Sequence, residues 1–178
     1  MFVCHKQAAK PAIIGEEKEV PAITDRHIFI AGNHGEMEAF LTDGLRSLLT
    51  NPDITCESLS EYTVRWPGHI EKFLDLRTSG ALDEQELVQQ WAYTTNRSEF
   101  TYMDITITQN NGPVVRWEFD IPGIDESKDR IWPSMAVATG IPFLVACEAL
   151  LDGRIQGIQS PDNYYSDLDG IVTRLRRL

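Results

Sequence analysis

Two segments that alternate apolar and polar residues, joined through Asn110-Asn111-Gly112, constrain the fold of this chain more than any other feature. The apolar positions are Met103, Ile105, Ile107 in the first segment and Val115, Trp117, Phe119, Ile121 in the second. Strict alternation is typical of a β-strand with one buried face. A three-residue loop with Gly112 in the left-handed conformation places Ile107 opposite Val115 and Ile105 opposite Trp117. Both apolar rows then share one face, and the other face is polar, either solvated or covered by a partner.

Helical patterns surround this predicted hairpin. Residues 134–151 are apolar nearly all round and predict a buried helix, kinked by Gly140-Ile141-Pro142 and ended by Gly153. Asp83-x-x-Glu86 is a capping box, and the helix it starts is predicted to bury Leu87, Val88 and Trp91. A last helix is predicted from the spacing of Leu168, Ile171, Val172 and Leu175. We therefore expect an α+β fold, a largely antiparallel (mixed) sheet with helices packed on one face.

Shorter elements are predicted ahead of the hairpin. His27–Ile30 reads as a strand that ends at a glycine-rich turn. Thr42-Asp43 is expected to cap a short helix with Leu45, Leu48 and Leu49 on its apolar face. Residues 1–24 are expected to form an extended arm or the remnant of a preceding segment, and residues 25–178 a single domain.

Composition limits the class of partner. The chain has 178 residues, of which 42% are hydrophobic, and a net charge of -11, so we expect neither nucleic acid nor a membrane surface as partner. Three cysteines without a CxxC spacing predict no disulfide framework and favour the cytoplasm. The first 20 residues do not resemble a signal peptide. No two glycines are spaced as G-x-G, and GxxxxGK, GxSxG and HExxH are also missing, so we expect no cofactor and no nucleophile machinery on this chain.

Residues 61–76, EYTVRWPGHIEKFLDL, carry the candidate site. A predicted strand ends on Arg65, and Pro67 is expected in the first turn of the amphipathic helix that follows. A guanidinium binds a carboxylate through two parallel hydrogen bonds, and a helix N-terminus also favours anions. The pattern thus predicts a carboxylate site, or alternatively a structural ion pair between Arg65 and an acid such as Asp43.

The sequence gives less support to two other kinds of site, a metal site and an acid–base site. His34 and His69 lack helical i, i+4 pairing, so turn histidines are favoured over a metal site. Asp104, Glu118 and Asp120 could be paired acid–base carboxylates, but their alternation favours the polar face of the hairpin.

Three blocks of the sequence resemble one protein family. Thr63-Val64-Arg65-Trp66-Pro67-Gly68-His69 resembles the T-L-R-Y-P-G-H motif in the C-terminal domain of the saccharopine dehydrogenase-like family, which includes lysine dehydrogenases and saccharopine reductases. Residues 36–49, EMEAFLTDGLRSLL, and residues 134–140, SMAVATG, are similar to two further family blocks, in the same order. The resemblance covers about residues 16 to 153.

The resemblance implies the substrate-binding and dimerisation domain of an NAD(P)-dependent oxidoreductase that acts on amino-acid C–N bonds. It implies that Arg65 holds a substrate carboxylate and that Thr63, His69, Thr42, Asp43 and Thr139 line the same cleft. NAD or NADP is expected in the full-length enzyme, on a Rossmann domain outside this chain, and a homodimer is expected. Which amino acid is the substrate, and which nucleotide is used, are left open.

The sequence also departs from the family pattern. Val137 and Ala138 stand where the family block has Arg and Thr, and Trp66 stands in place of Tyr. The alternative is therefore a non-catalytic dimeric module, or an amino-acid sensor, that kept the fold. We expect either a fragment or a standalone descendant of the substrate domain, so whether the chain belongs to an active enzyme stays open.

Overall fold

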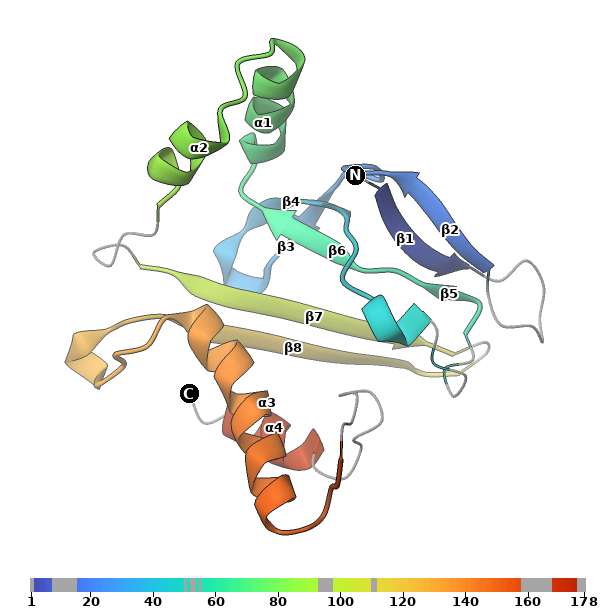
Figure 1. The fold of residues 1–178 in the computed structure, drawn as a ribbon, viewed down its shortest axis with the longest axis vertical. Helices are drawn as coiled ribbons and strands as arrows, with labels where there is room; N and C mark the ends of the chain where they lie inside the picture. Colours follow the sequence, from blue (N-terminus) through green and yellow to red (C-terminus); the bar gives the residue numbers. More distant parts are fainter. Residues whose placement is uncertain are drawn as a thin grey trace. The chain divides into compact units, whose positions relative to one another are not determined.

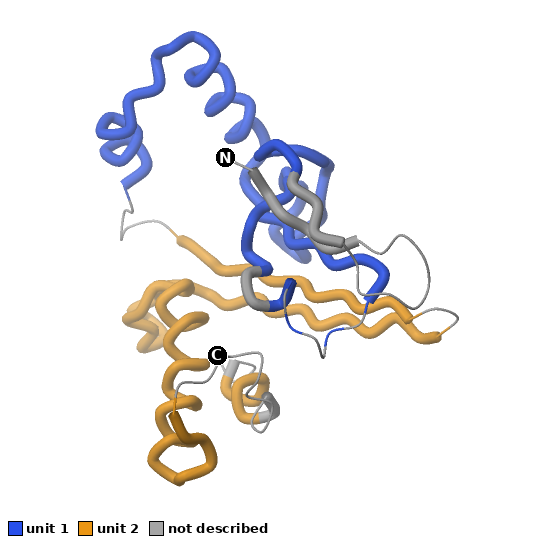
Figure 2. Tube along the Cα trace, turned by 45° about the vertical axis from the view of Figure 1, so that its right-hand side comes forward, with its two compact units in different colours: residues 1–92 blue, residues 93–178 orange. Residues whose placement is uncertain are grey.

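The computed structural model describes residues 2–7, 16–49, 51, 54, 56–92, 98–109, 112–157 and 168–175. The chain divides into two compact units, Met1–Ala92 and Tyr93–Leu178, each described here by itself (Figure 2). Every strand pair within them is antiparallel and helices accompany the sheets, so the predicted α+β class is confirmed. The predicted boundary between residues 24 and 25 stays a prediction.

The first unit contains two three-stranded sheets (Figure 1). One has the order β2-β1-β5, from Glu16–Pro21, Phe2–Gln7 and Ser58–Leu59. The other has the order β3-β4-β6, from His27–Ile30, Glu36–Leu41 and Tyr62–Arg65. The predicted strand at His27–Ile30 is confirmed, and 3-10 helix η1, Gly32–His34, turns the chain into β4.

Alternation gives the β3-β4-β6 sheet two distinct faces. We call the face of Met37, Ala39, Leu41, Tyr62 and Val64 the core face, because Met37, Ala39 and Leu41 are at most 6% exposed. The opposite face, the outer face, carries Glu38 and Phe40 from β4 with Arg65 and Thr63 opposite them on β6. The position of a residue in β6 therefore decides which of two surfaces its side chain reaches.

The segment after β4 differs from the predicted helix. Thr42 does not cap a helix, because its backbone N–H donates to the carbonyl of Glu61 at 3.1 Å and so extends the β4–β6 pairing. Only 3-10 helix η2, Arg46–Leu49, follows. Leu45 and Leu49 are buried as predicted.

Helices α1, His69–Thr78, and α2, Glu84–Gln90, complete the first unit. α1 starts at His69 with Gly68 as its N-cap at φ 81°, so Pro67 lies in the preceding turn and not in the first helical turn. Asp83 caps α2 as predicted by accepting from the N–H groups of Gln85 and Glu86.

The predicted buried face of α2 is wrong. Val88 is 72% exposed and Trp91 is 42% exposed. Figure 1 shows α2 standing away from the sheets of its own unit, so no sheet of that unit covers its apolar face.

The second unit is built on the predicted hairpin. β7, Phe100–Thr108, pairs with β8, Val114–Pro122, and the register places Ile107 opposite Val115 and Ile105 opposite Trp117, as predicted. Asn110 and Asn111 lie outside the described residues. Gly112 is not among the left-handed glycines, and its N–H donates to the carbonyl of Gln109 at 3.1 Å. Thr108 and Val114 are the last paired residues of β7 and β8, so the loop between the two strands is longer than the predicted three residues.

Helix α3, Ser134–Leu151, packs on both strands of this hairpin and against α4, Leu168–Leu175. Both helices were predicted, and Gly153, at φ 68°, follows the C-cap of α3. The expectation that α3 is buried is wrong, because Met135, Phe143 and Leu151 are 60%, 71% and 86% exposed. Within the second unit, α3 packs against one hairpin and one short helix, which together cover only part of the surface of α3. By length and composition alone, α3 could cross a membrane.

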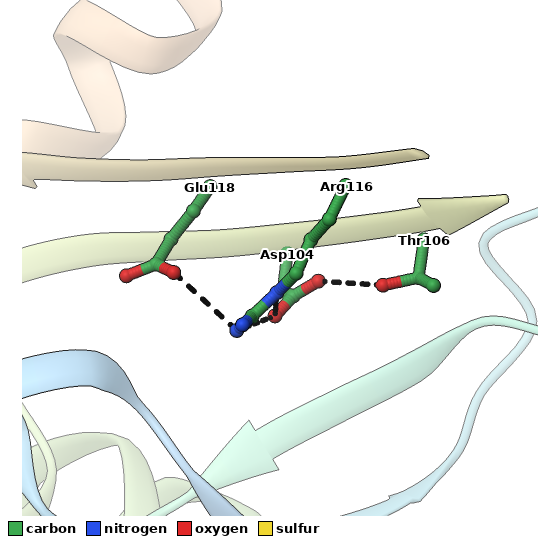
Figure 3. A network of polar contacts seen from close by, with 4 residues as sticks. All are labelled: Asp104, Thr106, Arg116 and Glu118. Atoms are coloured by element: carbon green, nitrogen blue, oxygen red, sulfur yellow. Dashed lines mark hydrogen bonds and ion pairs between the residues drawn. The ribbon is translucent and has the colours of Figure 1, made fainter. Parts of the chain in front are cut away.

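The polar face of the hairpin holds an ion-pair network (Figure 3). Arg116 Nε donates to Asp104 at 2.8 Å, and Arg116 Nη2 lies 3.3 Å from Glu118. The hydroxyl of Thr106 donates to Asp104 at 3.1 Å. Asp104 and Glu118 therefore share one guanidinium, an arrangement that suits a structural network rather than acid–base chemistry.

Candidate carboxylate-binding site

Arg65 is the last residue of β6, and its side chain is exposed on the outer face. Its Nη1 donates to the carbonyl of Val64 at 2.9 Å, which leaves the other guanidinium nitrogens available. The acid opposite Arg65 in the ladder is Glu38, whose carboxylate accepts from Arg26 Nε at 2.8 Å. Arg65 makes no ion pair with any residue that the structure describes, Asp43 included. Among the described residues, the Arg65 guanidinium is therefore available to accept a carboxylate as a partner.

Two threonine hydroxyls lie on the same face as Arg65. Thr63 precedes Arg65 by two residues, and its hydroxyl oxygen is 2.8 Å from that of Thr42. Both threonines are half-buried. Thr42 and Thr63 are therefore in contact on the face that also carries Arg65, and their role in binding a ligand stays a prediction.

Glu61 holds Thr42 and Gly44 in place, and it is not among the site residues predicted from the sequence. Its carboxylate accepts from the Thr42 hydroxyl and from the Gly44 N–H, the latter at 3.1 Å. A Cβ atom on Gly44 would lie 2.7 Å from Glu61 Cδ, so only glycine lets the carboxylate approach this closely. The signal that could have found Glu61 is its period-two spacing with Thr63 and Arg65.

His69 is the first residue of α1 and lies near Arg65. Its ring centroid is 4.6 Å from that of Trp91, at an interplanar angle of 41°. Burial lowers the pKa of His69 below its ordinary value, and the positive charges of Arg65 and Lys72 lower it further. His69 is therefore neutral at pH 7 and offers a hydrogen bond rather than a charge.

Asp43 and Thr139 are the remaining residues of the predicted site. Asp43 follows Thr42 and is half-buried. Thr139 belongs to α3 in the second unit, where its hydroxyl donates to the Met135 carbonyl at 2.8 Å. The structure thus groups Thr42, Thr63 and Arg65, with His69 beside Arg65, and the part of Thr139 in the site stays a prediction.

The chemistry of this group is binding and orientation. Arg65 and Lys72 supply positive charge beside the N-terminus of α1. The Thr42 hydroxyl donates its proton to Glu61 and the Thr63 hydroxyl donates to Thr42, so the two hydroxyls are left to accept from a ligand. Within the described residues no three His, Cys, Asp or Glu side chains are grouped as metal ligands. No protein-family model matches this chain, and no curated protein matches it significantly.

Proposed function

We propose that this chain is the substrate-binding and dimerisation domain of an NAD(P)-dependent oxidoreductase that acts on amino-acid C–N bonds, as its resemblance to the saccharopine dehydrogenase-like family implies. The observation that carries the proposal is the exposed guanidinium of Arg65, which has no acidic partner among the described residues and shares the outer face with Thr63. An arginine held at a strand end beside a helix start is suited to a carboxylate.

In this proposal the chain works by positioning. Arg65 binds the substrate carboxylate, and the Thr63 and Thr42 hydroxyls, fixed by Glu61, restrict how the ligand lies. His69, being neutral, adds a hydrogen bond without repelling a substrate ammonium group. The nicotinamide cofactor, bound by a separate Rossmann domain, supplies the hydride chemistry.

A second candidate is a non-catalytic module that kept the fold, either a dimeric interaction domain or an amino-acid sensor. Val137 and Ala138 favour it, because in this chain they replace the Arg and Thr of the family block. Both lie half-buried on α3, where they offer neither a charge nor a hydroxyl.

Calorimetric titration of the chain with amino acids and dicarboxylates tests the shared binding step. Saturable binding that Arg65→Ala abolishes and Arg65→Lys weakens supports the proposed site. Arg77→Ala is the matched control, because Arg77 is an exposed arginine of the same unit that stacks on Phe73. Equal loss in both variants, or no binding by the wild type, contradicts the carboxylate site.

A second measurement separates the two candidates. In a full-length enzyme, Arg65→Ala is expected to raise KM for the amino acid far more than KM for the nucleotide. Binding without any turnover in the full-length protein favours the sensor, and a dimer without amino-acid binding favours the interaction domain.

A further inference from the structure

A solvent-open cavity of about 470 Å³ lies in the first unit, on the side of the β3-β4-β6 sheet opposite to Arg65. Leu41 and Tyr62 face each other across β4 and β6 and line this cavity, whereas Thr63 and Arg65 point to the outer face. The volume is within the range of small-molecule sites. The cavity is therefore separate from the proposed carboxylate site.

The polar lining of the cavity is acidic and rich in hydroxyl groups. The described polar lining residues are Asp25, Thr24, Ser58, Ser60 and Tyr62. Asp25 is the one charged side chain among the described lining residues, and no basic side chain is among them. Val20, Pro21 and Leu41 supply aliphatic surface. A ligand that suits this lining carries a positive charge, hydrogen-bond donors and a short apolar part.

The backbone holds Asp25 at the cavity in an unusual conformation. Asp25 has φ 53°, and Ile23, a β-branched residue, has φ 64°. Such a conformation is an outlier for a β-branched side chain and concentrates at functional sites. The turn is fixed at both ends, because the Leu41 N–H donates to the Thr24 carbonyl at 3.1 Å and the Thr24 hydroxyl donates to the Pro21 carbonyl at 3.0 Å.

Tyr62 orients the Asp25 carboxylate. Its hydroxyl donates to Asp25 Oδ2, and the His27 ring packs edge-on against the Tyr62 ring at a centroid distance of 5.0 Å. Burial and the hydrogen bond to Asp25 raise the pKa of Tyr62 to about 12, so the phenol remains a donor at physiological pH. One carboxylate oxygen is engaged in this way, and Oδ1 remains to accept from a ligand.

We infer that this cavity binds a small organic cation, a primary ammonium group on a short aliphatic chain, with Asp25 Oδ1 accepting from the ammonium. The hydroxyls of Ser58 and Ser60 accept its remaining N–H groups, and Leu41 with Val20 packs against the chain. This assignment uses no residue of the proposed carboxylate site and stands independently of it.

The test is an amide chemical-shift titration of the full chain with n-butylammonium chloride, with sodium chloride and sodium butyrate as separate controls. The expected result is a saturable shift at Leu41, Ser60 and Tyr62 with butylammonium, and none with either control. Asp25→Asn is expected to weaken binding at least about tenfold, as loss of one charge-assisted hydrogen bond implies. Asparagine tolerates the left-handed conformation, so this variant keeps the turn.

Asp75→Asn removes the same charge from an exposed position on α1 and is expected to bind as the wild type does. Tyr62→Phe, which frees the Asp25 carboxylate to rotate, is expected to weaken binding by a smaller factor than Asp25→Asn. The inference is overturned if the shift does not saturate, if Asp25→Asn binds like Asp75→Asn, or if butyrate produces the same shifts.

Discussion

The carboxylate of Glu99 caps the first turn of α3 through Ser134. The Ser134 N–H donates to Glu99 Oε1 at 2.7 Å, and the Ser134 hydroxyl donates to Oε2. Ser134 is fully buried, and its hydroxyl oxygen lies 2.8 Å from that of Thr101 on β7. The N-cap residue of α3, Pro133, has no side-chain donor or acceptor, so the cap comes from Glu99, which is 35 positions before Ser134 in the chain.

Removing this cap is expected to destabilise the protein. Glu99→Gln keeps the shape but loses the charge that complements the helix N-terminus, so we expect a loss of about 1–2 kcal/mol in the free energy of unfolding. Urea denaturation followed by circular dichroism measures it. Glu126→Gln, an exposed glutamate of the same unit, is expected to change stability by less than about 0.5 kcal/mol. Similar losses in both variants would show that Glu99 is not the cap.

Gly44→Ala is expected to cost about 1 kcal/mol, because the added methyl group would lie 2.7 Å from Glu61 Cδ and displace the carboxylate from its hydrogen bond to the Gly44 N–H. Glu61→Ala in the same chain removes that clash, so the double variant is expected to lose less than the sum of the single losses. Gly140→Ala is the control, since no atom lies within 4 Å of the added Cβ and the residue is inside α3. This control is expected to be neutral or to stabilise the protein. Additive losses for Gly44→Ala and Glu61→Ala would contradict the close approach.

Burial, and then the positive charge of Arg65, lower the pKa of His69 below its ordinary value, so this pKa is expected to respond to Arg65. Arg65→Ala removes a repelling positive charge and is expected to raise the His69 pKa towards its ordinary value, as measured by NMR of the imidazole protons. Lys72→Ala is expected to raise it by a smaller amount, and Arg77→Ala to leave it unchanged. A His69 pKa that does not respond to Arg65→Ala would place the two side chains too far apart to share a ligand.

Tyrosine ionisation supplies a pH-dependent test of stability. The pKa of Tyr62 is raised to about 12 from 10.0, mainly by burial and then by its hydrogen bond to Asp25. The pKa is raised in the folded state, so the stabilising contribution is fully present below pH 10 and is lost between about pH 10 and 12. Unfolding free energies measured across this range are expected to fall less steeply for Tyr62→Phe than for the wild type. Tyr102 also ionises near 12, so Tyr62→Phe should retain part of the effect.

The hairpin register was predictable from sequence because the residues between the strands mark where the chain reverses, and period-two alternation excludes the one-residue slips that would separate the two apolar rows. The cap of α2 was predictable because it is local to Asp83 and Glu86. The cap of α3 was not, since Glu99 is distant in the sequence and no local pattern marks it. Burial of Val88 and of α3 was mispredicted because apolar spacing reports which face is able to pack, not whether a neighbour exists.

Part of the candidate site was also predictable from the sequence, and part was not. Arg65 at a strand end could be expected from the turn that follows it, and the turn is present. The period-two spacing with Thr63 and Arg65 could have placed Glu61 on their face, but its partners Thr42 and Gly44 could not be foreseen, because those contacts depend on the antiparallel pairing of β4 with β6.

The alternation of β6 has an evolutionary consequence. A single residue inserted or deleted directly before Tyr62 would shift the register of all four positions and turn Arg65 and Thr63 inward and Tyr62 outward, so the proposed carboxylate site and the proposed ammonium site would be lost in one event. Point substitutions, in contrast, alter either surface without disturbing the other. Length variation in this strand should therefore be rarer among descendants of the protein than variation in its side chains.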